Sequence, residues 1–324
     1  MSVLTHDRAE LPASGLGFAV VSAASFGLAG SLGRGLMDAG WSAAAAVTVR
    51  VLVAAAVLAV PAALALRGRW SLLRRNLATL TGYGVVAVAG CQLCYFNAVA
   101  HMQVGVALLI EYIAPVAVIG WLWLRHGQRP GRLTVAGAAV AGAGLVLVLD
   151  LVSGAEVSLV GIVWALGAMA GVTVYFVVSS HEAEALPGSV LAAGGLLVGG
   201  IFLLLVGALG IVPMTATTRR VEFDGFGVAW WVPVAALGVV TAALAYVAGI
   251  AATRRLGSRL ASFVGLAEVL AALVFAWLLL GELPRGIQVL GAVLVLSGVI
   301  VVKLGEGRTA QAGLERESAL IPLG

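Results

Sequence analysis

Cysteine and charged side chains are scarce in this sequence. Its 324 residues include only two cysteines, Cys91 and Cys94, so no disulfide framework is possible beyond that one pair. Charged residues make up 10% of the chain, against about 25% in soluble domains. Lys303 is the only lysine, so arginine supplies nearly all of the 19 basic residues. The shortage of charge excludes an ordinary soluble globular protein.

Motifs for catalysis, metals and cofactors are missing as well. The four histidines are scattered along the chain, without the spacing of a metal site. The sequence contains no phosphate-binding glycine loop, hydrolase elbow or zinc motif, and its many glycines lie within apolar runs, where they serve helix packing. We therefore predict no enzymatic activity, no metal and no cofactor.

Apolar residues are abundant instead. They make up 61% of the chain, and exchanging the 5 Tyr of this class for the 43 Gly gives about 73%, compared with roughly 45–50% in soluble domains. A soluble fold could not bury so much apolar surface, so lipid must be a large part of the solvent. The net charge of +4 does not indicate nucleic-acid binding, because the arginines sit in short gaps between apolar runs.

Runs of about 20 apolar residues, each long enough to cross some 30 Å of hydrocarbon, divide the chain. We predict an all-α integral membrane protein with ten transmembrane helices. The predicted spans are 15–37, 41–66, 77–100, 105–125, 132–151, 157–180, 189–211, 227–252, 260–281 and 285–304. Residues 1–14 and 305–324 are predicted tails, the second of them solvated and mobile. Among the loops, only the one from Val212 to Phe226 is long enough to carry structure of its own.

The distribution of arginine predicts the orientation. Cytoplasmic loops are enriched in Arg and Lys. With the N-terminus in the cytoplasm, the inner loops hold Arg67, Arg69, Arg74, Arg75, Arg125, Arg129, Arg132, Arg254, Arg255 and Arg259. The outer loops then hold only Arg34, Arg219, Arg220 and Arg285. We therefore predict a multi-pass plasma-membrane protein with both termini in the cytoplasm.

The second half of the chain repeats the first. A shift of 154 positions aligns Pro115 with Val269, Gly137 with Gly291 and Gly144 with Gly298. The predicted halves, 15–151 and 157–304, hold five helices each. Because five is odd, the second half enters the membrane from the opposite side, and the repeats must be inverted. Inverted repeats provide two nearly equivalent packings, one open to each face, which is the physical basis of alternating access.

Three segments carry a more specific signal. They are Val49-Arg50-Val51-Leu52, the stretch GVALLIEYIAPV that begins at Gly105, and AEVLAALVFAWLLLGELPRGIQVLGAVLVLSGVIVV, which begins at Ala267. Together they resemble the EamA-type branch of the drug/metabolite transporter superfamily. The resemblance covers residues 15–304. It implies a ten-helix fold of inverted five-helix repeats around a central cavity, usually exporting amino acids or other small metabolites.

The chain departs from the family pattern at two places. Gly127-Gln128 stands where the family commonly has Gly-Glu, and Glu268-Val269 stands where Glu-Pro is usual. The first departure argues against a role that needs a carboxylate at both loop sites. The second predicts a straighter ninth helix than the fourth, because Pro115 removes a backbone hydrogen bond and Val269 does not.

Three Arg or Glu residues lie well inside predicted spans, away from the span ends. At 1.5 Å per residue, Arg50 is about 14 Å and Glu111 about 9 Å below the outer surface, and Glu268 is about 14 Å from the inner side. Ionised groups at such depths are costly and should face the bundle or water. Arg50 is either a substrate or gating contact or part of a structural ion pair. We hypothesise that it pairs with Glu111, which leaves Glu268 as the titrating group.

Polar and aromatic side chains within the spans are further candidates for substrate binding. Asn97 offers both a donor and an acceptor. Tyr112, Tyr175 and Tyr246 are candidates for lining a cavity, although tyrosines near span ends more often anchor a helix at the interface. The glycine pairs with GxxxG spacing fit either a homodimer face or packing within the bundle. These pairs are Gly167 with Gly171 and Gly195 with Gly199.

These features predict an inner-membrane secondary transporter that exports a small metabolite such as an amino acid. Proton coupling through Glu268 or Glu111 is an additional hypothesis. The expected partners are a small-molecule substrate and the bilayer, not nucleic acid. One alternative is efflux of drugs or toxic cations, which embedded glutamates favour and Arg50 opposes. Another is a membrane thiol oxidoreductase using Cys91 and Cys94, which the lack of a second cysteine pair disfavours.

Overall fold

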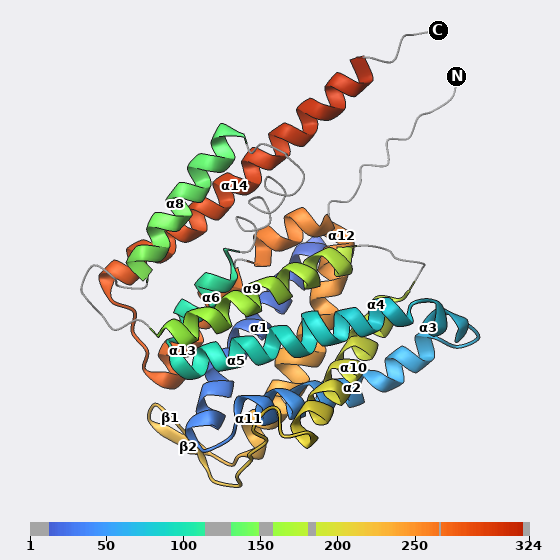
Figure 1. Cartoon of the computed structure of the whole chain (residues 1–324), viewed down its shortest axis with the longest axis vertical. Coiled ribbons are helices and arrows are strands. Elements are labelled where there is room, and N and C mark those ends of the chain that lie inside the picture. Colours follow the sequence, from blue (N-terminus) through green and yellow to red (C-terminus); the bar gives the residue numbers. More distant parts are fainter. Residues whose placement is uncertain (1–12, 114–130, 149–157, 181–185, 266, 320–324) are drawn as a thin grey trace.

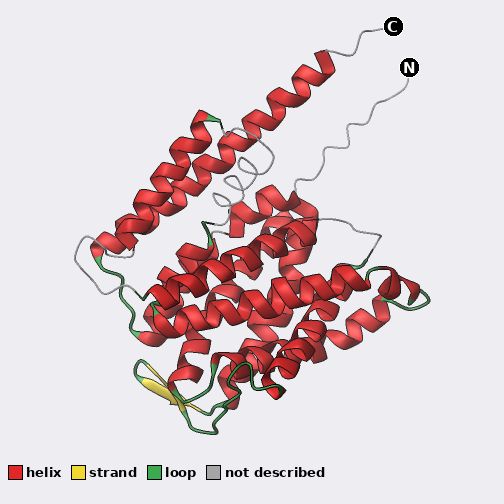
Figure 2. Ribbon diagram, viewed as in Figure 1, coloured by secondary structure: helices red, strands yellow, loops and turns green. Residues whose placement is uncertain are grey.

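The protein is described here by a computed structural model that covers residues 13–113, 131–148, 158–180, 186–265 and 267–319. Helices dominate these residues, and Figure 2 shows a two-stranded hairpin beside them. The helices of the first half are α1 Ala13–Asp38, α2 Ala43–Ala65, α3 Ser71–Arg75, α4 Leu77–Gly82, η1 Tyr83–Gly90, α5 Cys91–His101, α6 Val104–Glu111 and α8 Arg132–Val148. The elements of the second half are α9 Leu159–Ser180, α10 Gly188–Ala208, β1 Val221–Phe223, β2 Phe226–Val228, α11 Trp231–Gly238, η4 Val239–Leu244, α12 Ala245–Gly265, α13 Ala267–Leu280 and α14 Gly286–Ala319.

Apolar helices match most of the predicted spans. The helices long and apolar enough to cross a membrane are Gly15–Asp38, Ala43–Ala65, Leu77–His101, Gly188–Ala208 and Trp231–Leu256. Shorter apolar helices occupy Arg132–Leu147, Leu159–Tyr175, Ala267–Leu280 and Gly286–Val302. The remaining span, 105–125, is described only through residue 113, so Pro115 and Gly127-Gln128 lie outside the described residues. A helical membrane protein is confirmed, and the number of ten spans stays a prediction.

Some predicted boundaries were wrong. The eighth helix starts at Trp231 rather than at residue 227, because Phe226–Val228 pairs with β1 as strand β2. It also runs on to Gly265, so the ninth helix begins only at Ala267. The predicted C-terminal tail continues α14 as a helix to Ala319. The prediction that the loop after Val212 carries structure of its own is confirmed by the hairpin.

Two long helices each contain a π-helical segment, η1 in the third predicted span and η4 in the eighth. A π segment shifts the backbone hydrogen-bond pattern and often marks a functional site. Each segment packs closely on a helix of the other half. A Cβ at Gly84, in η1, would lie 2.7 Å from the carbonyl oxygen of Gly195 in α10. A Cβ at Gly238, the residue before η4, would meet the side chain of Val53 in α2.

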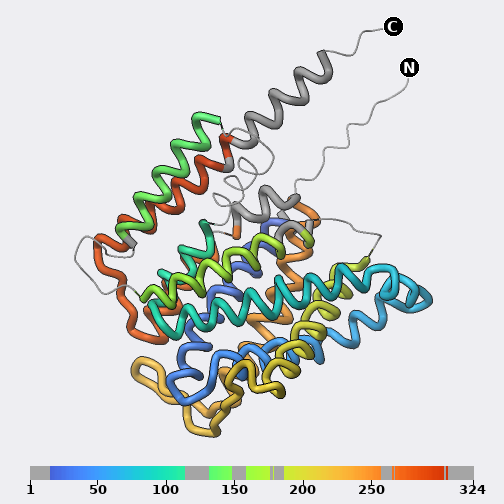
Figure 3. Tube along the Cα trace, viewed as in Figure 1, coloured from blue at the N-terminus to red at the C-terminus, as the bar shows by residue number. Residues whose placement is uncertain are grey.

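The contacts between helices follow the internal repeat. In the first half α1 packs against α12 and α13, and its counterpart α9 packs against α5 and α6. Three helices pack against their own counterparts: α2 against α10, α6 against α13, and α8 against α14. The helices of the two halves therefore interleave, as the colours in Figure 3 show, and the bundle has one shared core.

The pair α8 and α14 lies at one side of the bundle (Figure 1). A Cβ at Gly137 would lie 2.7 Å from the oxygen of Gly298, and one at Gly144 would lie 2.7 Å from the oxygen of Gly291. The two helices are therefore antiparallel with their backbones in contact, which only glycine permits. In the repeat, Gly137 corresponds to Gly291 and Gly144 to Gly298. The two contacts are therefore equivalent to each other, as a two-fold relation between the halves requires.

We expect Gly144→Ala to lower the free energy of unfolding by about 1–3 kcal/mol, because its Cβ would meet backbone atoms of α14 that cannot move aside. Gly142 provides a matched control two residues away, since a Cβ there meets nothing within 4 Å. Gly142→Ala should be neutral or slightly stabilising. Thermal unfolding of the two purified variants in the same detergent measures both effects. Equal unfolding midpoints would contradict close packing of α8 on α14.

Candidate functional site

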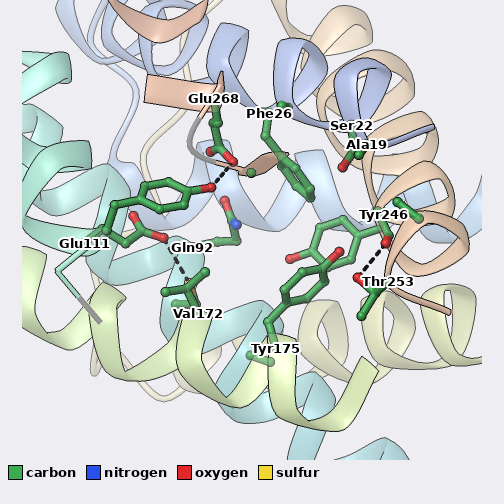
Figure 4. A pocket seen from close by; sticks show the side chains of 17 residues that line it. Ala19, Ser22, Phe26, Gln92, Glu111, Val172, Tyr175, Tyr246, Thr253 and Glu268 are labelled. Carbon is green, nitrogen blue, oxygen red and sulfur yellow. Dashed lines mark hydrogen bonds between the residues drawn. The ribbon is translucent and has the colours of Figure 1, made fainter. Parts of the chain in front are cut away.

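A cavity of about 60 Å³ lies where the two halves meet. The first half contributes residues from α1, η1, α5 and the end of α6, and the second half contributes residues from α9, α12 and α13. Five of the seven residues predicted from the sequence line this cavity, and Figure 4 labels all of them except Tyr112. These five are Glu111, Tyr112, Tyr175, Tyr246 and Glu268.

The two glutamates are placed by helix ends. Glu111 is the last residue of α6, and Tyr112 forms the turn that follows it. The sequence favours an end here, because Pro115 has no N–H to donate to the carbonyl of Glu111. Glu268 lies in the first turn of α13. The prediction that Glu268 lies about 14 Å into its helix was wrong, because residues up to Gly265 belong to α12.

A hydrogen bond joins the two helix ends across the cavity. Tyr112 Oη donates to Glu268 Oε2 at 2.6 Å, so α6 of one half is tied to α13 of the other. The carboxylate oxygens of Glu111 have fewer hydrogen-bond donors. Its Oε1 lies 3.9 Å from the Cys91 thiol, a weak donor, and its buried Oε2 has no hydrogen-bond partner among the described residues. The cavity therefore has spare capacity to accept hydrogen bonds.

Aromatic rings form another wall of the cavity. The rings of Phe26, Tyr175 and Tyr246 meet edge to face, with centroids 5.1 to 6.3 Å apart. Ser22 lies one helical turn before Phe26 on α1 and donates to the carbonyl of Ala245 at 2.9 Å. This wall combines aromatic rings with the hydroxyl groups of Tyr175 and Tyr246, and Thr253 also lines the cavity.

Arg50 lies outside the cavity lining and does not pair with Glu111, so the structure contradicts that hypothesis. The side chain is 1% exposed, and its two terminal nitrogens donate to Gln92 Oε1 and to the carbonyl of Thr241 in η4, the latter at 2.5 Å. Its guanidinium also lies 5.5 Å from the centre of the Phe96 ring. Arg50 therefore links α2 and α5 to the π segment of the other half.

Asn97 does not reach the cavity either, because its amide nitrogen donates to the carbonyl of Leu93 in the same helix at 2.8 Å. The two cysteines are free thiols, and they pack against α9. A Cβ at Gly167 would lie 2.8 Å from the Cys94 sulfur, and Gly171 packs against Cys91. Both residues of this GxxxG pair thus serve packing within the bundle. Among the described residues, no three His, Cys, Asp or Glu side chains gather in a metal-binding group.

Sequence reasoning missed Gln92 and Phe26, which both line the cavity. Gln92 had a usable signal, because it is an uncharged polar residue within a mostly apolar span and lies between the two cysteines. Phe26 had none, since a phenylalanine in an apolar run gives no indication of which side of the helix faces a cavity.

Hydrogen bonds link neighbouring elements at the end of the bundle that carries the hairpin. There Arg34 Nη1 donates to the carbonyl of Val99 at 2.7 Å, and the backbone N–H of Val104 donates to Glu282 Oε2 at 3.2 Å. Burial raises the pKa of Glu282, and the Val104 bond and the nearby Arg34 partly oppose this shift. The N–H of Asp224, in the hairpin, donates to the carbonyl of Leu279 at 2.8 Å. These bonds join α1 to α5, α6 to the loop after α13, and the hairpin to α13.

Comparison with known proteins agrees with this architecture. A solved structure described only as "Crystal structure of protein" superposes with a TM-score of 0.59 and 20% identity, over 91% of this chain and 97% of that one. At this identity the likeness shows the fold alone. No curated protein sequence matches the chain. The EamA-like transporter family matches residues 13–150 and again residues 159–304. Since these two matches cover most of the sequence, the chain belongs to the EamA-like transporter family and is a membrane transporter.

Proposed function

We propose that this protein is a secondary transporter of the plasma membrane that exports a small metabolite by alternating access. Its ten spans form two inverted five-helix halves, residues 15–151 and 157–304, with both termini in the cytoplasm. The observation that carries the proposal is the cavity, because both halves line it and it contains two glutamates. A binding site at the interface of inverted repeats is accessible to either face when one half moves against the other.

The inverted relation is supported by α8 and α14, which are counterparts in the repeat and run antiparallel through their glycine contacts. With the N-terminus inside, the cavity-lining residues of α1 and α12 lie in the cytoplasmic half of the membrane. With that orientation the bonds of Arg34, Glu282 and Asp224 lie at the outer end of the bundle.

Transport can be tested directly with a panel of amino acids and small amines in proteoliposomes. The purified chain should give saturable flux of at least one panel member, above the leak of protein-free vesicles. Repeating the assay with and without an imposed pH gradient tests proton coupling, which predicts a higher rate when protons flow against the substrate. If no amino acid or cation crosses under either condition, the transporter proposal is wrong for these substrate classes.

A further inference from the structure

The cavity has an uneven charge balance. It contains the carboxyl groups of Glu111 and Glu268, and none of its described lining residues is basic. Glu111 is 7% exposed, and its Oε2 is buried with no partner in the described part of the chain. A buried acceptor without a donor is costly in an apolar surrounding. The cavity is therefore incomplete until a group with N–H or O–H donors enters it.

The nearest arginine does not supply that group. Arg50 is directed to Gln92 and to the carbonyl of Thr241, and it lies outside the lining. Arg254 and Arg255, on the cavity-lining helix α12, are engaged elsewhere, with the carbonyl of Leu186 and the ring of Phe18. The sequence from Ile113 to Leu124, which follows Tyr112 directly, has no ionisable residue.

The aromatic wall points to the same kind of ligand. A cation is attracted by the faces of aromatic rings, most strongly when water is excluded. Phe26, Tyr175 and Tyr246 supply such rings opposite the glutamates (Figure 4). The carboxylates accept hydrogen bonds from N–H donors, which a primary ammonium has and a quaternary ammonium lacks. The cavity volume of about 60 Å³ holds on the order of four to six waters, so the bound group is small.

Building on the transporter proposal, we propose that the substrate is a small primary ammonium ion without a carboxylate, held by Glu111 and Glu268 against the aromatic wall. This narrows the substrate class from amino acids to amines. The carboxylate of an amino acid would enter a cavity that already holds two carboxyl groups, and like charges brought together oppose binding. The ammonium N–H groups would donate to Glu111 Oε2 and to the oxygens of Glu268.

Four probes of similar size separate the contributions of the positive charge, the N–H donors and a carboxylate to binding. They are n-butylammonium, its neutral analogue 1-butanol, the zwitterion 4-aminobutyrate and tetramethylammonium. Isothermal titration calorimetry on the full chain in detergent micelles should give n-butylammonium a dissociation constant about tenfold or more below those of the other three. If 1-butanol or 4-aminobutyrate binds as tightly, or no probe binds, the proposal is overturned. Tighter binding of tetramethylammonium overturns the role assigned to the N–H donors.

Two variants locate the bound amine. Glu111→Gln should weaken binding of n-butylammonium about tenfold or more while leaving 1-butanol unaffected. Glu222→Gln, which removes an exposed carboxylate in the hairpin, should change neither the dissociation constant of n-butylammonium nor that of 1-butanol. If Glu111→Gln does not fold, the comparison of the four probes on the unaltered chain still tests whether the cavity prefers a primary ammonium. Binding of n-butylammonium without flux contradicts transport alone, whereas flux restricted to neutral or anionic solutes contradicts the amine proposal alone.

Discussion

Replacing Gln92 with Leu should lower the free energy of unfolding by about 3 kcal/mol, because it removes a hydrogen-bond partner of a buried charge. Gln92 Oε1 accepts a bond from Arg50, and without it the guanidinium keeps Thr241 O as its described acceptor. A hydrogen bond to a charged group contributes about 1.5–3 kcal/mol. We expect the upper end of this range, because Arg50 is 1% exposed. Denaturant unfolding in detergent measures the change.

A double variant tests whether the charge of Arg50 causes the loss of stability. Adding Arg50→Met to Gln92→Leu removes the charge that the single change leaves poorly paired, so the double variant should be more stable than Gln92→Leu alone. Gln103→Leu is a matched control, because Gln103 is exposed and should contribute about 0.5 kcal/mol or less. If Gln92→Leu is as stable as the unaltered protein, the Arg50–Gln92 bond does not stabilise the bundle.

Replacing Glu268 with Gln should reduce transport of the preferred amine about thirtyfold, since losing one partner of a buried charge pair costs at least about 2 kcal/mol. At about 1.4 kcal/mol per tenfold change, that cost corresponds to a factor of about thirty. Glutamine keeps the shape of the side chain and an oxygen for the Tyr112 hydroxyl, so the effect isolates the charge. Initial rates in proteoliposomes, measured over a series of pH values, provide the readout.

Tyr112→Phe is the companion variant. It removes the hydroxyl that donates to Glu268 and leaves the carboxylate in place, so its effect on rate should be smaller, about tenfold or less. The ionisable groups that interact with Glu268 are Tyr112, Glu111 across the cavity, and the buried guanidinium of Arg50. If Glu268→Gln changes neither the rate nor its pH dependence, Glu268 is neither a proton carrier nor a substrate contact.

The candidate site was partly predictable from the sequence. Ionisable, amide and hydroxyl-bearing residues within apolar spans stand out, and five of the seven chosen on that basis line the cavity. Depth along the span was a poor guide to pairing. Arg50 and Glu111 have similar predicted depths, yet Arg50 bonds to Gln92 and to the backbone of Thr241. A linear sequence gives the depth of a side chain but not the direction in which it points around the helix axis.

The sequence by itself determined that this is a helical membrane protein built from a repeat, because run length, arginine placement and glycine spacing are local properties of the chain. Only the tertiary structure decided which residues share the cavity. That depends on where helices of the two halves cross, as when Tyr112 meets Glu268, which lies 156 positions away in the sequence. It also depends on where the π segments lie, since Arg50 donates to the Thr241 carbonyl within η4 and such a segment has no signature in hydropathy.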